Sequence, residues 1–495
     1  MKQPVILSLD QGTTSTRCLA IAPDGMTVAS AQRELQQHYP QPGWVEHDGE
    51  QILADALFCL RQVIETLSHE YQPVAIGITN QRETTLVWDR ANGKPIHRAI
   101  VWQDRRTSDL CSRLKSAGHE KTVSEKTGLL LDPYFSASKV AWILDHVDGA
   151  RERAEKGQLA FGTVETFLLW HLTGGDKHIS DETNAARTSL WNIHTGRWDT
   201  DLLDLFNVPA NLLPDVVPSA YRFGESDPDI LGVTLPICGM AGDQQSASFG
   251  QLCLSAGQMK ATYGTGCFVL MNTGGKAVSS QNKLLTTRAC RIGGEPQFAL
   301  EGSIFMAGAI SQWLRDEMGL IVSSDETEAL ASSIDSTNGV YLVPAFTGLG
   351  APHWDSEVRA AIFGMTRQTG KAEIVRAAME AVTYQTSDLI QAFAADGGMP
   401  DLVRVDGGMS ANGWLMQYIS DMTGIRLERP ANLETTALGA AFLAGLTIGV
   451  WNSTDDLHKL GGEVTGFIPD TNTEHRSMAM EGWHKAIRAA QAFSD

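Results

Sequence analysis

The chain has 495 residues, and this length favours two large domains, because single domains usually hold on the order of 100–250 residues. Its formal net charge of -19 argues against nucleic acid or an anionic membrane surface as the main partner, since both would be repelled. The seven cysteines are scattered and form no C-x-x-C pair, so we expect neither a zinc site nor a disulfide framework, and a reducing cytoplasm fits best.

The first half of the chain predicts a strand meander followed by a mixture of helices and strands. Five apolar segments have the length and composition of strands: 5–9, 18–22, 26–34, 74–79 and 86–88. A helix is expected to begin at Asp48, because leucines recur at helical spacing from Leu53 to Leu67. Residues 104–175 are rich in helical patterns.

The second half repeats this order. Four apolar segments predict strands there: 237–242, 258–263, 268–271 and 402–405. Four further segments have helical spacing: 303–318, 372–393, 412–423 and 434–446. Two halves that each combine a strand meander with helices suggest a duplicated α/β architecture, with a boundary near residue 250.

The nearest candidate for a membrane span is the uncharged stretch Ala437–Trp451, which contains Gly445-x-x-x-Gly449. It is shorter than the roughly 20 apolar residues that cross a bilayer. We therefore expect a buried, closely packed helix here and no membrane span.

Three turns that follow predicted strands suit phosphate groups, although the chain contains neither a P-loop nor an intact dinucleotide fingerprint. The turn Asp10-Gln11-Gly12-Thr13-Thr14-Ser15 offers a carboxylate, a glycine and hydroxyls, and Arg17 adds a positive charge. This turn predicts a nest for a terminal phosphate with a Mg²⁺ ligand beside it. The other turns are Tyr263-Gly264-Thr265-Gly266 and Asp406–Asn412, the second of which opens a helix whose N-terminus suits a nucleotide. Each turn alone is more often a simple change of direction, but the three together favour nucleotide binding.

Two longer segments, Tyr134–His146 and Ala360–Glu380, carry a family resemblance. Together with the three turns, they make the chain similar to the FGGY carbohydrate kinases of the actin-like ATPase superfamily, from about residue 4 to 490. The resemblance implies an α/β fold of two actin-like (ribonuclease H-like) ATPase domains with a nucleotide and substrate cleft between them. Residues 1–249 would form the substrate and terminal-phosphate side, and residues 250–495 the adenosine side.

The segment Thr79–Thr85 indicates the branch of the family. Its Arg82-Glu83 pair resembles the members that phosphorylate glycerol, whereas xylulose-specific members usually carry a Gly-Gln-Met-His-like segment here. Arg82 offers donors in a fixed geometry and Glu83 offers acceptors, which together suit vicinal hydroxyl groups. A salt-bridging surface pair is the alternative interpretation.

The resemblance also implies roles for individual residues. Asp243 would be the general base that accepts the proton of a primary hydroxyl as the phosphoryl bond forms, with a helix N-cap as the alternative. The substrate would contact Arg82, Glu83, Trp102, Tyr134, Asp243, Gln244 and Phe268. The nucleotide would contact Thr13, Thr14, Ser15, Arg17, Thr265, Gly308, Gln312, Gly408 and Asn412. Asp10 and Asp243 would lie beside Mg²⁺. For the aromatic residues, ordinary core packing is the alternative.

The expected activity is therefore ATP-dependent phosphorylation of glycerol to sn-glycerol 3-phosphate, with Mg²⁺ as cofactor, in a cytoplasmic homo-oligomer that is a dimer or a tetramer. A kinase for another polyol or ketose, such as xylulose, is the alternative within the family. An ATPase of the actin or chaperone type is the alternative of a different class.

The chain departs from many enterobacterial members in the stretch Phe223–Leu235, which is acidic and contains neither lysine nor arginine. In those relatives a lysine-containing loop here resembles a site for inhibition by fructose 1,6-bisphosphate. Other bacterial members carry a phosphorylatable histidine in this region, and Pro218–Pro236 contains none. We expect neither control to operate in this protein.

Overall fold

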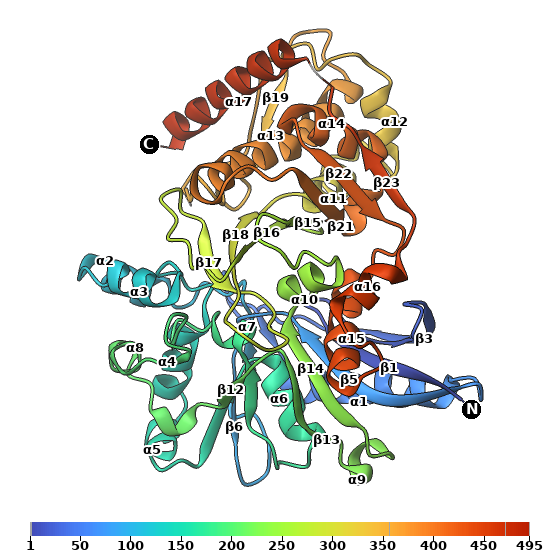
Figure 1. The fold of residues 1–495 in the computed structure, drawn as a ribbon. Helices are drawn as coiled ribbons and strands as arrows, with labels where there is room; N and C mark the ends of the chain where they lie inside the picture. Colours follow the sequence, from blue (N-terminus) through green and yellow to red (C-terminus); the bar gives the residue numbers. More distant parts are fainter. Residues whose placement is uncertain (1, 356, 471, 495) are drawn as a thin grey trace.

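The computed structural model describes residues 2–355, 357–470 and 472–494, and it is a mixed α/β protein built around two large sheets (Figure 1). The first sheet has the strand order β13-β14-β5-β1-β2-β3. Its strands are β1 (Gln3–Gln11), β2 (Ser15–Ile21), β3 (Thr27–Glu34), β5 (Tyr71–Asn80), β13 (Ala220–Glu225) and β14 (Pro236–Gly242). The first three form the expected antiparallel meander, β5 and β14 run parallel to β1, and β13 is an antiparallel edge.

The second sheet repeats this topology, with the strand order β17-β18-β16-β15-β21-β22-β23. Its strands are β15 (Met259–Tyr263), β16 (Cys267–Gly274), β17 (Leu285–Arg288), β18 (Phe298–Ile304), β21 (Leu402–Asp406), β22 (Arg426–Pro430) and β23 (Val464–Phe467). The antiparallel strands β15, β16 and β18 again precede two parallel strands and an antiparallel edge strand, β23, and β17 is an added antiparallel strand beside β18. The predicted duplicated α/β architecture is confirmed.

Five two-stranded sheets complete the strands of the described residues. They are β4 (Glu46–His47) with β7 (Ala99–Ile100), β6 (Leu86–Asp89) with β8 (Leu159–Gly162), β9 (Ile179–Asp181) with β12 (Asp215–Val217), β10 (Trp191–Asn192) with β11 (Arg197–Trp198), and β19 (Tyr341–Val343) with β20 (Ala361–Phe363). The predicted strand at 86–88 therefore lies outside the main sheet, where it pairs with β8.

The helices of the first half include α1 (Gly49–Thr66), which begins where expected because the Asp48 carboxylate accepts hydrogen bonds from the N–H groups of Glu50 and Gln51. The others are α2 (Ser108–Ser116), α3 (Glu120–Thr127), α4 (Ser136–His146), α5 (Ala150–Glu155), α6 (Val164–Leu172), α7 (Glu182–Ala185), α8 (Thr200–Phe206), α9 (Pro228–Leu231) and α10 (Asp243–Gly250). In the second half lie α11 (Gly308–Asp316), α12 (Glu326–Ser332), α13 (Lys371–Gly397), α14 (Gly413–Thr423), α15 (Thr435–Ile448), α16 (Thr454–Leu460) and α17 (Thr473–Ser494). Short 3₁₀ turns lie at Ala210–Leu212 and Gly408–Ala411.

The predicted helix over 303–318 is wrong at its start, because Ser303 and Ile304 end strand β18 and the helix begins only at Gly308. All residues of β18 are buried, since the strand pairs with β16 on one side and β17 on the other. A strand buried on both faces loses the alternation of polar and apolar residues that marks strands in a sequence.

The uncharged stretch Ala437–Trp451, considered above as a candidate membrane span, lies largely in helix α15. The helix packs on strands of the first sheet and on α10, although it belongs to the second half of the sequence (Figure 1). A Cβ atom at Gly77 would lie 2.3 Å from the Ala440 carbonyl oxygen, so the strand and the helix are in backbone contact. Of the helices described, none is both long and apolar enough to cross a membrane. The boundary at residues 249 and 250 stays a prediction.

Candidate active site

Strand register brings Asp10 and Asp243 to the edge of the first sheet that is formed by the carboxyl ends of its parallel strands. Asp10 near the end of β1 pairs with Thr79 of β5, and Thr79 pairs on its other side with Ala241 of β14. Asp243 follows β14 directly and is the first residue of α10. Strand spacing places the ends of β1 and β14 about 10 Å apart, on either side of β5. The loop that continues from β5 carries Arg82 and Glu83, so the edge gathers both aspartates with the predicted substrate pair.

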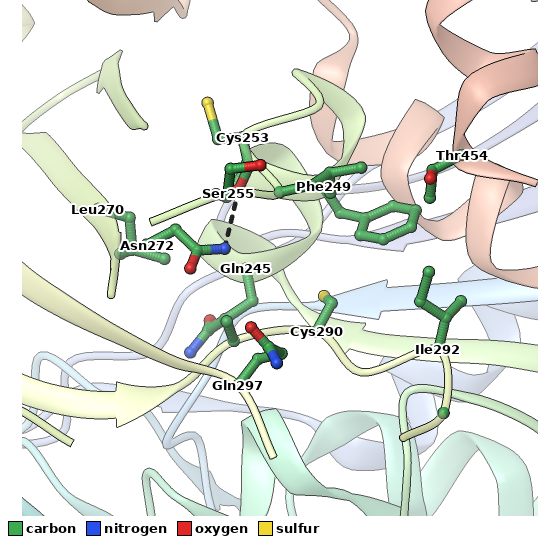
Figure 2. A pocket seen from close by; sticks show the side chains of 14 residues that line it. Gln245, Phe249, Cys253, Ser255, Leu270, Asn272, Cys290, Ile292, Gln297 and Thr454 are labelled. Atoms are coloured by element: carbon green, nitrogen blue, oxygen red, sulfur yellow. Dashed lines mark hydrogen bonds between the residues drawn. The ribbon is translucent and has the colours of Figure 1, made fainter. Parts of the chain in front are cut away.

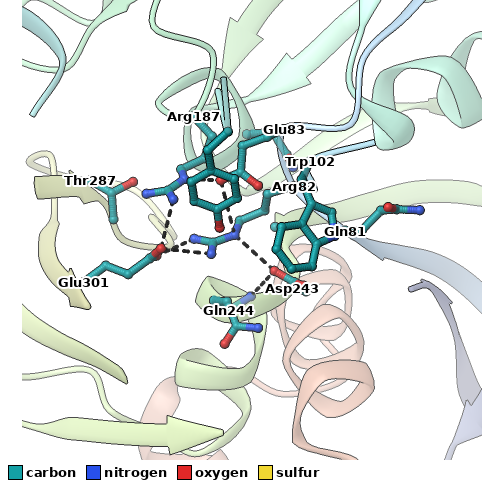
Figure 3. Close-up of polar contacts among 12 residues, drawn as sticks. Gln81, Arg82, Glu83, Trp102, Arg187, Asp243, Gln244, Thr287 and Glu301 are labelled. Carbon is teal, nitrogen blue, oxygen red and sulfur yellow. Dashed lines mark hydrogen bonds and ion pairs between the residues drawn. The ribbon is translucent and has the colours of Figure 1, made fainter. Parts of the chain in front are cut away.

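Arg82 lies at the centre of the residues gathered here, and it is buried with carboxylates around it (Figure 3). Its Nε lies 3.1 Å from Asp243 Oδ1. Its two terminal nitrogens donate to the two oxygens of Glu301 at 2.5 and 3.0 Å, and Nη1 also donates to Gln245 Oε1 at 3.2 Å. The alternative of a surface ion pair with Glu83 is therefore excluded, since Arg82 is 2% exposed and Glu83 is 1% exposed.

Arg187 and Glu301 belong to the same cluster, although neither residue was predicted from the sequence. Arg187 Nε donates to Glu83 Oε1 at 2.6 Å, and its Nη2 donates to Glu301 Oε1 at 2.9 Å. Burial raises the pKa of the Glu83 carboxyl, which the two arginines partly oppose, whereas the arginines hold the pKa of Glu301 below its ordinary value despite its burial. Glu301 is the one charged residue in the apolar strand Phe298–Ile304, and that interruption is the signal that could have revealed it.

Three aromatic rings lie together beside the buried cluster. Trp102 makes edge contacts with Tyr134 and Phe268, at ring-centroid distances of 5.7 and 6.1 Å. Its indole Nε1 donates to the Thr13 hydroxyl at 2.9 Å, which links the aromatic group to the first phosphate turn. The three rings come from separate parts of the chain and are half-buried, so each ring keeps part of its surface outside the core. They offer an apolar wall that suits the carbon chain of a small polyol.

Helix α10 presents Asp243 and Gln244 at the same edge. The Asp243 carboxylate accepts the N–H of Gln244 at 2.7 Å, while Gly242 is the N-cap residue. Burial raises the pKa of Asp243, and the nearby Arg82 guanidinium and Lys260 ammonium groups oppose this shift. The buried Lys260 of β15, which the sequence analysis also missed, donates to Gln244 Oε1 and to the Thr262 hydroxyl.

The first predicted phosphate turn connects β1 and β2 at the same sheet edge. Thr13 and Ser15 are half-buried and Thr14 is exposed, so their hydroxyl groups are open to a ligand. Arg17 donates through Nε and Nη2 to Asp10 Oδ2, both at 3.1 Å, and also pairs with Glu434. Burial raises the pKa of Asp10, while the Arg17 guanidinium opposes the increase.

The other predicted nucleotide residues lie on the second half of the molecule. Gly264 and Thr265 form an exposed turn between β15 and β16, and the N–H of Gly308 donates to the Gly264 carbonyl at 2.9 Å. Gly308 and the exposed Gln312 lie one turn apart on α11, as expected. Gly408 is exposed on the turn after β21. Asn412 caps α14 by accepting the Leu415 N–H, and its amide donates to Thr327, so a protein role accounts for its side chain as well.

A cavity of about 360 Å³ is lined in part by residues of α10 (Figure 2). Its lining includes Gln245, Phe249, Asn272, Cys290 and Gln297, none of which carries a charge. A phosphate group would find no cation on these walls. The cavity is therefore separate from the predicted phosphate turns.

Comparison with known proteins defines the class of this chain. The family model for the N-terminal domain of the FGGY family of carbohydrate kinases matches residues 5–250, and the model for the C-terminal domain matches residues 259–448. The chain belongs to the FGGY family of carbohydrate kinases.

Relatives with high sequence identity to this chain have a more specific description within the family, that of glycerol kinase. The chain is 53% identical to a glycerol kinase of Ectopseudomonas mendocina over 98% of its own length and 99% of that protein. Among solved structures, a glycerol kinase of Plasmodium falciparum with ADP matches at a TM-score of 0.93 and 36% identity, covering 99% of this chain and 98% of the other. A ligand-bound xylulose kinase of Lactobacillus acidophilus matches at a TM-score of 0.89 but only 19% identity, over 99% and 98% of the two chains, which shows the shared fold alone.

Proposed function

We propose that this protein transfers the γ-phosphoryl group of ATP to a primary hydroxyl of glycerol, giving sn-glycerol 3-phosphate and ADP. The observation that carries the proposal is the contact of Arg82 with Asp243, because it joins a hydroxyl-binding residue and a proton acceptor in one site. The glycerol kinases that share about half of its sequence, and the relative solved with ADP, support the same substrates.

Asp243 is the residue that we assign as general base. A primary alcohol is a poor nucleophile, and a carboxylate within hydrogen-bond reach accepts its proton as the new P–O bond forms. The raised pKa of Asp243 strengthens it as a base, while Arg82 and Lys260 favour the ionised form that the reaction requires. One Asp243 oxygen, Oδ1, contacts Arg82 and the Gln244 N–H, and the part of the chain that is described offers no hydrogen-bond partner to the other.

Mg²⁺ would be held by Asp10 and Asp243 together with the nucleotide phosphates. The described residues contain no group of three or more metal-ligating side chains. This fits magnesium, which is usually bound through one or two carboxylates, several waters and substrate phosphates. Among described contacts, Asp10 binds Arg17 only through Oδ2, so Oδ1 remains available. When bound, the ion would neutralise negative charge on the phosphates, while Arg17 lies beside the same turn.

The positions of the predicted phosphate turns support a nucleotide site between the two halves of the molecule. Thr13, Thr14 and Ser15 would contact the terminal phosphates from the first half, and Thr265 would contact another part of the nucleotide from the second. Gly308, Gln312, Gly408 and Asn412 would hold the remainder of the nucleotide. The exposed positions of Thr14, Thr265, Gln312 and Gly408 leave them accessible to such a ligand.

A substrate panel tests the proposal directly. ADP release would be followed with glycerol, dihydroxyacetone, xylulose and ribulose, and with no acceptor. We expect kcat/KM to be highest for glycerol by at least about tenfold, since one well-matched hydroxyl contact is worth about that factor. Preference for xylulose would favour the alternative within the family. ADP release at an equal rate without an acceptor would indicate an ATPase instead.

Three wider features also remain proposals. The family resemblance supports a homo-oligomer and a cytoplasmic location. The stretch Phe223–Leu235 spans the end of β13 and helix α9, and its acidic character supports the absence of inhibition by fructose 1,6-bisphosphate. Potent inhibition by that bisphosphate at physiological concentration would contradict this last proposal.

A further inference from the structure

Glu301 links the substrate residues of the first half to the second sheet. It lies in the middle of β18, whereas Arg82 follows β5 and Arg187 follows α7, 219 and 114 positions away from it. Figure 3 shows its carboxylate between the two guanidinium groups. Oε1 accepts from both arginines and Oε2 accepts from Arg82, so this one carboxylate orients both side chains.

The cluster depends on Glu301 because its members have little access to water. Arg82, Arg187 and Glu301 are 2%, 0% and 1% exposed. Two buried guanidinium groups side by side repel each other, and a carboxylate between them offsets that repulsion. Bidentate pairing with a planar guanidinium also fixes its orientation, which a neutral acceptor does less well.

Glu301 orients both members of the predicted substrate pair, Arg82 and Glu83. It accepts hydrogen bonds directly from Arg82, and it orients Glu83 through Arg187, which donates to Glu83 Oε1 at 2.6 Å. Among described contacts, Gln245 and Glu301 engage three of the five N–H groups of Arg82 by hydrogen bonds. The remaining N–H groups, on Nε and Nη2, are those left for Asp243 and for a substrate hydroxyl.

We propose that Glu301 is a positioning residue for the polyol site. It holds Arg82 and Arg187 in the geometry that recognises substrate hydroxyls, and it can do so only when the second sheet is docked against the first half. This inference rests on the proposed phosphorylation of glycerol. It adds to that proposal a residue from the other half of the molecule, so that recognition of the polyol depends on how the two halves are joined.

The test compares Glu301→Gln with a matched variant, Glu182→Gln. Glu182 of α7 is also a buried carboxylate that pairs across the two halves, with Arg291 at 2.5 Å and Arg288 at 3.6 Å, but it contacts none of the predicted substrate residues. Steady-state kinetics would be measured with glycerol and ATP varied separately, together with the thermal unfolding midpoint of each protein. A purely structural role would move stability in both variants without separating the two KM values.

We expect Glu301→Gln to raise the KM for glycerol at least about tenfold, which corresponds to roughly one charged hydrogen bond. The KM for ATP should change less than about twofold, and Glu182→Gln should keep the wild-type KM for glycerol. An equal KM for glycerol in Glu301→Gln and Glu182→Gln would overturn the proposal.

A second variant keeps the test decisive if Glu301→Gln does not fold. Arg187→Lys preserves the charge but removes the planar fork that joins Glu83 to Glu301. We expect a similar selective rise in the KM for glycerol, and an unchanged value would contradict the proposal. Wild-type protein that fails to phosphorylate glycerol would instead contradict the proposed function, and the two failures are thus distinguishable.

Discussion

At the scale of single residues, Asp243 combines partial exposure with two cationic neighbours. Its side chain is 31% exposed and contacts Arg82 at 3.1 Å, so a substrate hydroxyl can approach it beside a cation that favours its ionised form. Asp243 was predicted from the family resemblance, and its electrostatic partners Arg82 and Lys260 come from distant segments of the chain. Its assigned role as general base is open to a direct test.

Asp243→Asn should abolish most turnover while nucleotide binding is kept. The amide cannot accept the proton of the hydroxyl group, so we expect kcat to fall at least about 100-fold, the usual contribution of a general base. The ATP dissociation constant, measured by calorimetry, should stay within about threefold. Asp229→Asn, in the acidic stretch of α9, is the control and should retain wild-type kcat. Turnover of Asp243→Asn near the wild-type rate would refute the base assignment.

Glu165 is a buried carboxyl outside the proposed site. Its Oε1 accepts from the hydroxyl groups of Thr163, Thr166 and Ser180, while Oε2 has no partner among the described atoms. Burial raises the pKa of Glu165 from 4.5 to about 7. The folded protein therefore keeps this proton at pH values where the unfolded chain has released it, so Glu165 makes the protein less stable as pH rises through this range.

Glu165→Gln should remove that dependence on pH. A pKa difference between 4.5 and about 7 corresponds to about 3 kcal/mol, and this loss is complete above pH 7 and absent below pH 4.5. The wild type should therefore become less stable relative to the variant between pH 5 and pH 8, as measured by urea unfolding. Glu481→Gln, at an exposed position of α17, should show a constant difference from wild type. A constant difference for Glu165→Gln as well would show that Glu165 does not retain its proton.

At the scale of elements, the turn after β21 contains two adjacent glycines with different requirements. Gly407 has a φ of 84°, and a Cβ atom there would lie 2.5 Å from the Tyr263 carbonyl oxygen, so the fold itself requires glycine. A Cβ atom at Gly408 would meet no protein atom within 4 Å. The fold therefore does not require glycine at position 408, and the open space beside it leaves room for the proposed nucleotide.

Gly408→Ala should leave the unfolding midpoint within about 1 °C of wild type, since surface changes of this kind cost little. It should raise the KM for ATP about tenfold, because the added methyl group would lie where the nucleotide approaches. Gly407→Ala is the paired variant and should lose stability instead. An unchanged KM for ATP in Gly408→Ala would remove Gly408 from the nucleotide site.

Helix α15 sets the position of helix α10 through a backbone contact. A Cβ atom at Gly439 would lie 1.9 Å from the Ser246 carbonyl oxygen, three residues beyond Asp243. The contact leaves no room for a side chain, so the two helices approach as closely as their backbones allow. Helix α15 thus supports the helix that presents the proposed base.

Gly439→Ala should destabilise the protein by about 1–3 kcal/mol, the usual cost of overpacking. Because α10 must shift to admit the methyl group, kcat should also fall. Gly462→Ala is the control, since a Cβ atom there would meet nothing within 4 Å, and its unfolding free energy should stay within about 0.5 kcal/mol. Equal stability of the two variants, measured by urea unfolding, would show that α10 and α15 tolerate separation.

At the scale of the whole molecule, the predicted phosphate turns that follow β1 and β15 belong to the two different sheets (Figure 1). A nucleotide that contacts Thr14 and Thr265 would join these halves, and closure that excludes water would limit wasteful ATP hydrolysis. We expect glycerol with a non-hydrolysable ATP analogue to decrease the radius of gyration measured by X-ray scattering. Glycerol with inorganic phosphate is the control and should have less effect. An unchanged radius with the analogue would contradict closure.

Much of the fold was predictable because its signals are local. The meander of β1, β2 and β3 and the later strands β5, β14 and β21 contain apolar runs that can be seen in the sequence, and each lies where expected. The failure at 303–318 has a physical cause, since β18 is buried on both faces and has no alternation of polar residues. The packing of α15 on the first sheet depends on contacts between distant segments, such as Gly77 with Ala440.

The chemistry of the turns is evident without a structure, because a carboxylate, a glycine and hydroxyls that are adjacent in the chain remain adjacent in any fold. The Arg82-Glu83 pair is evident in the same way, since it needs no tertiary contact to be seen. The contact of Arg82 with Asp243, and the place of Glu301 and Arg187 in the same cluster, depend on the folded arrangement of distant segments. Such a cluster has no local pattern, because the stabilisation of a buried charge depends on partners that the fold brings from up to 219 positions away.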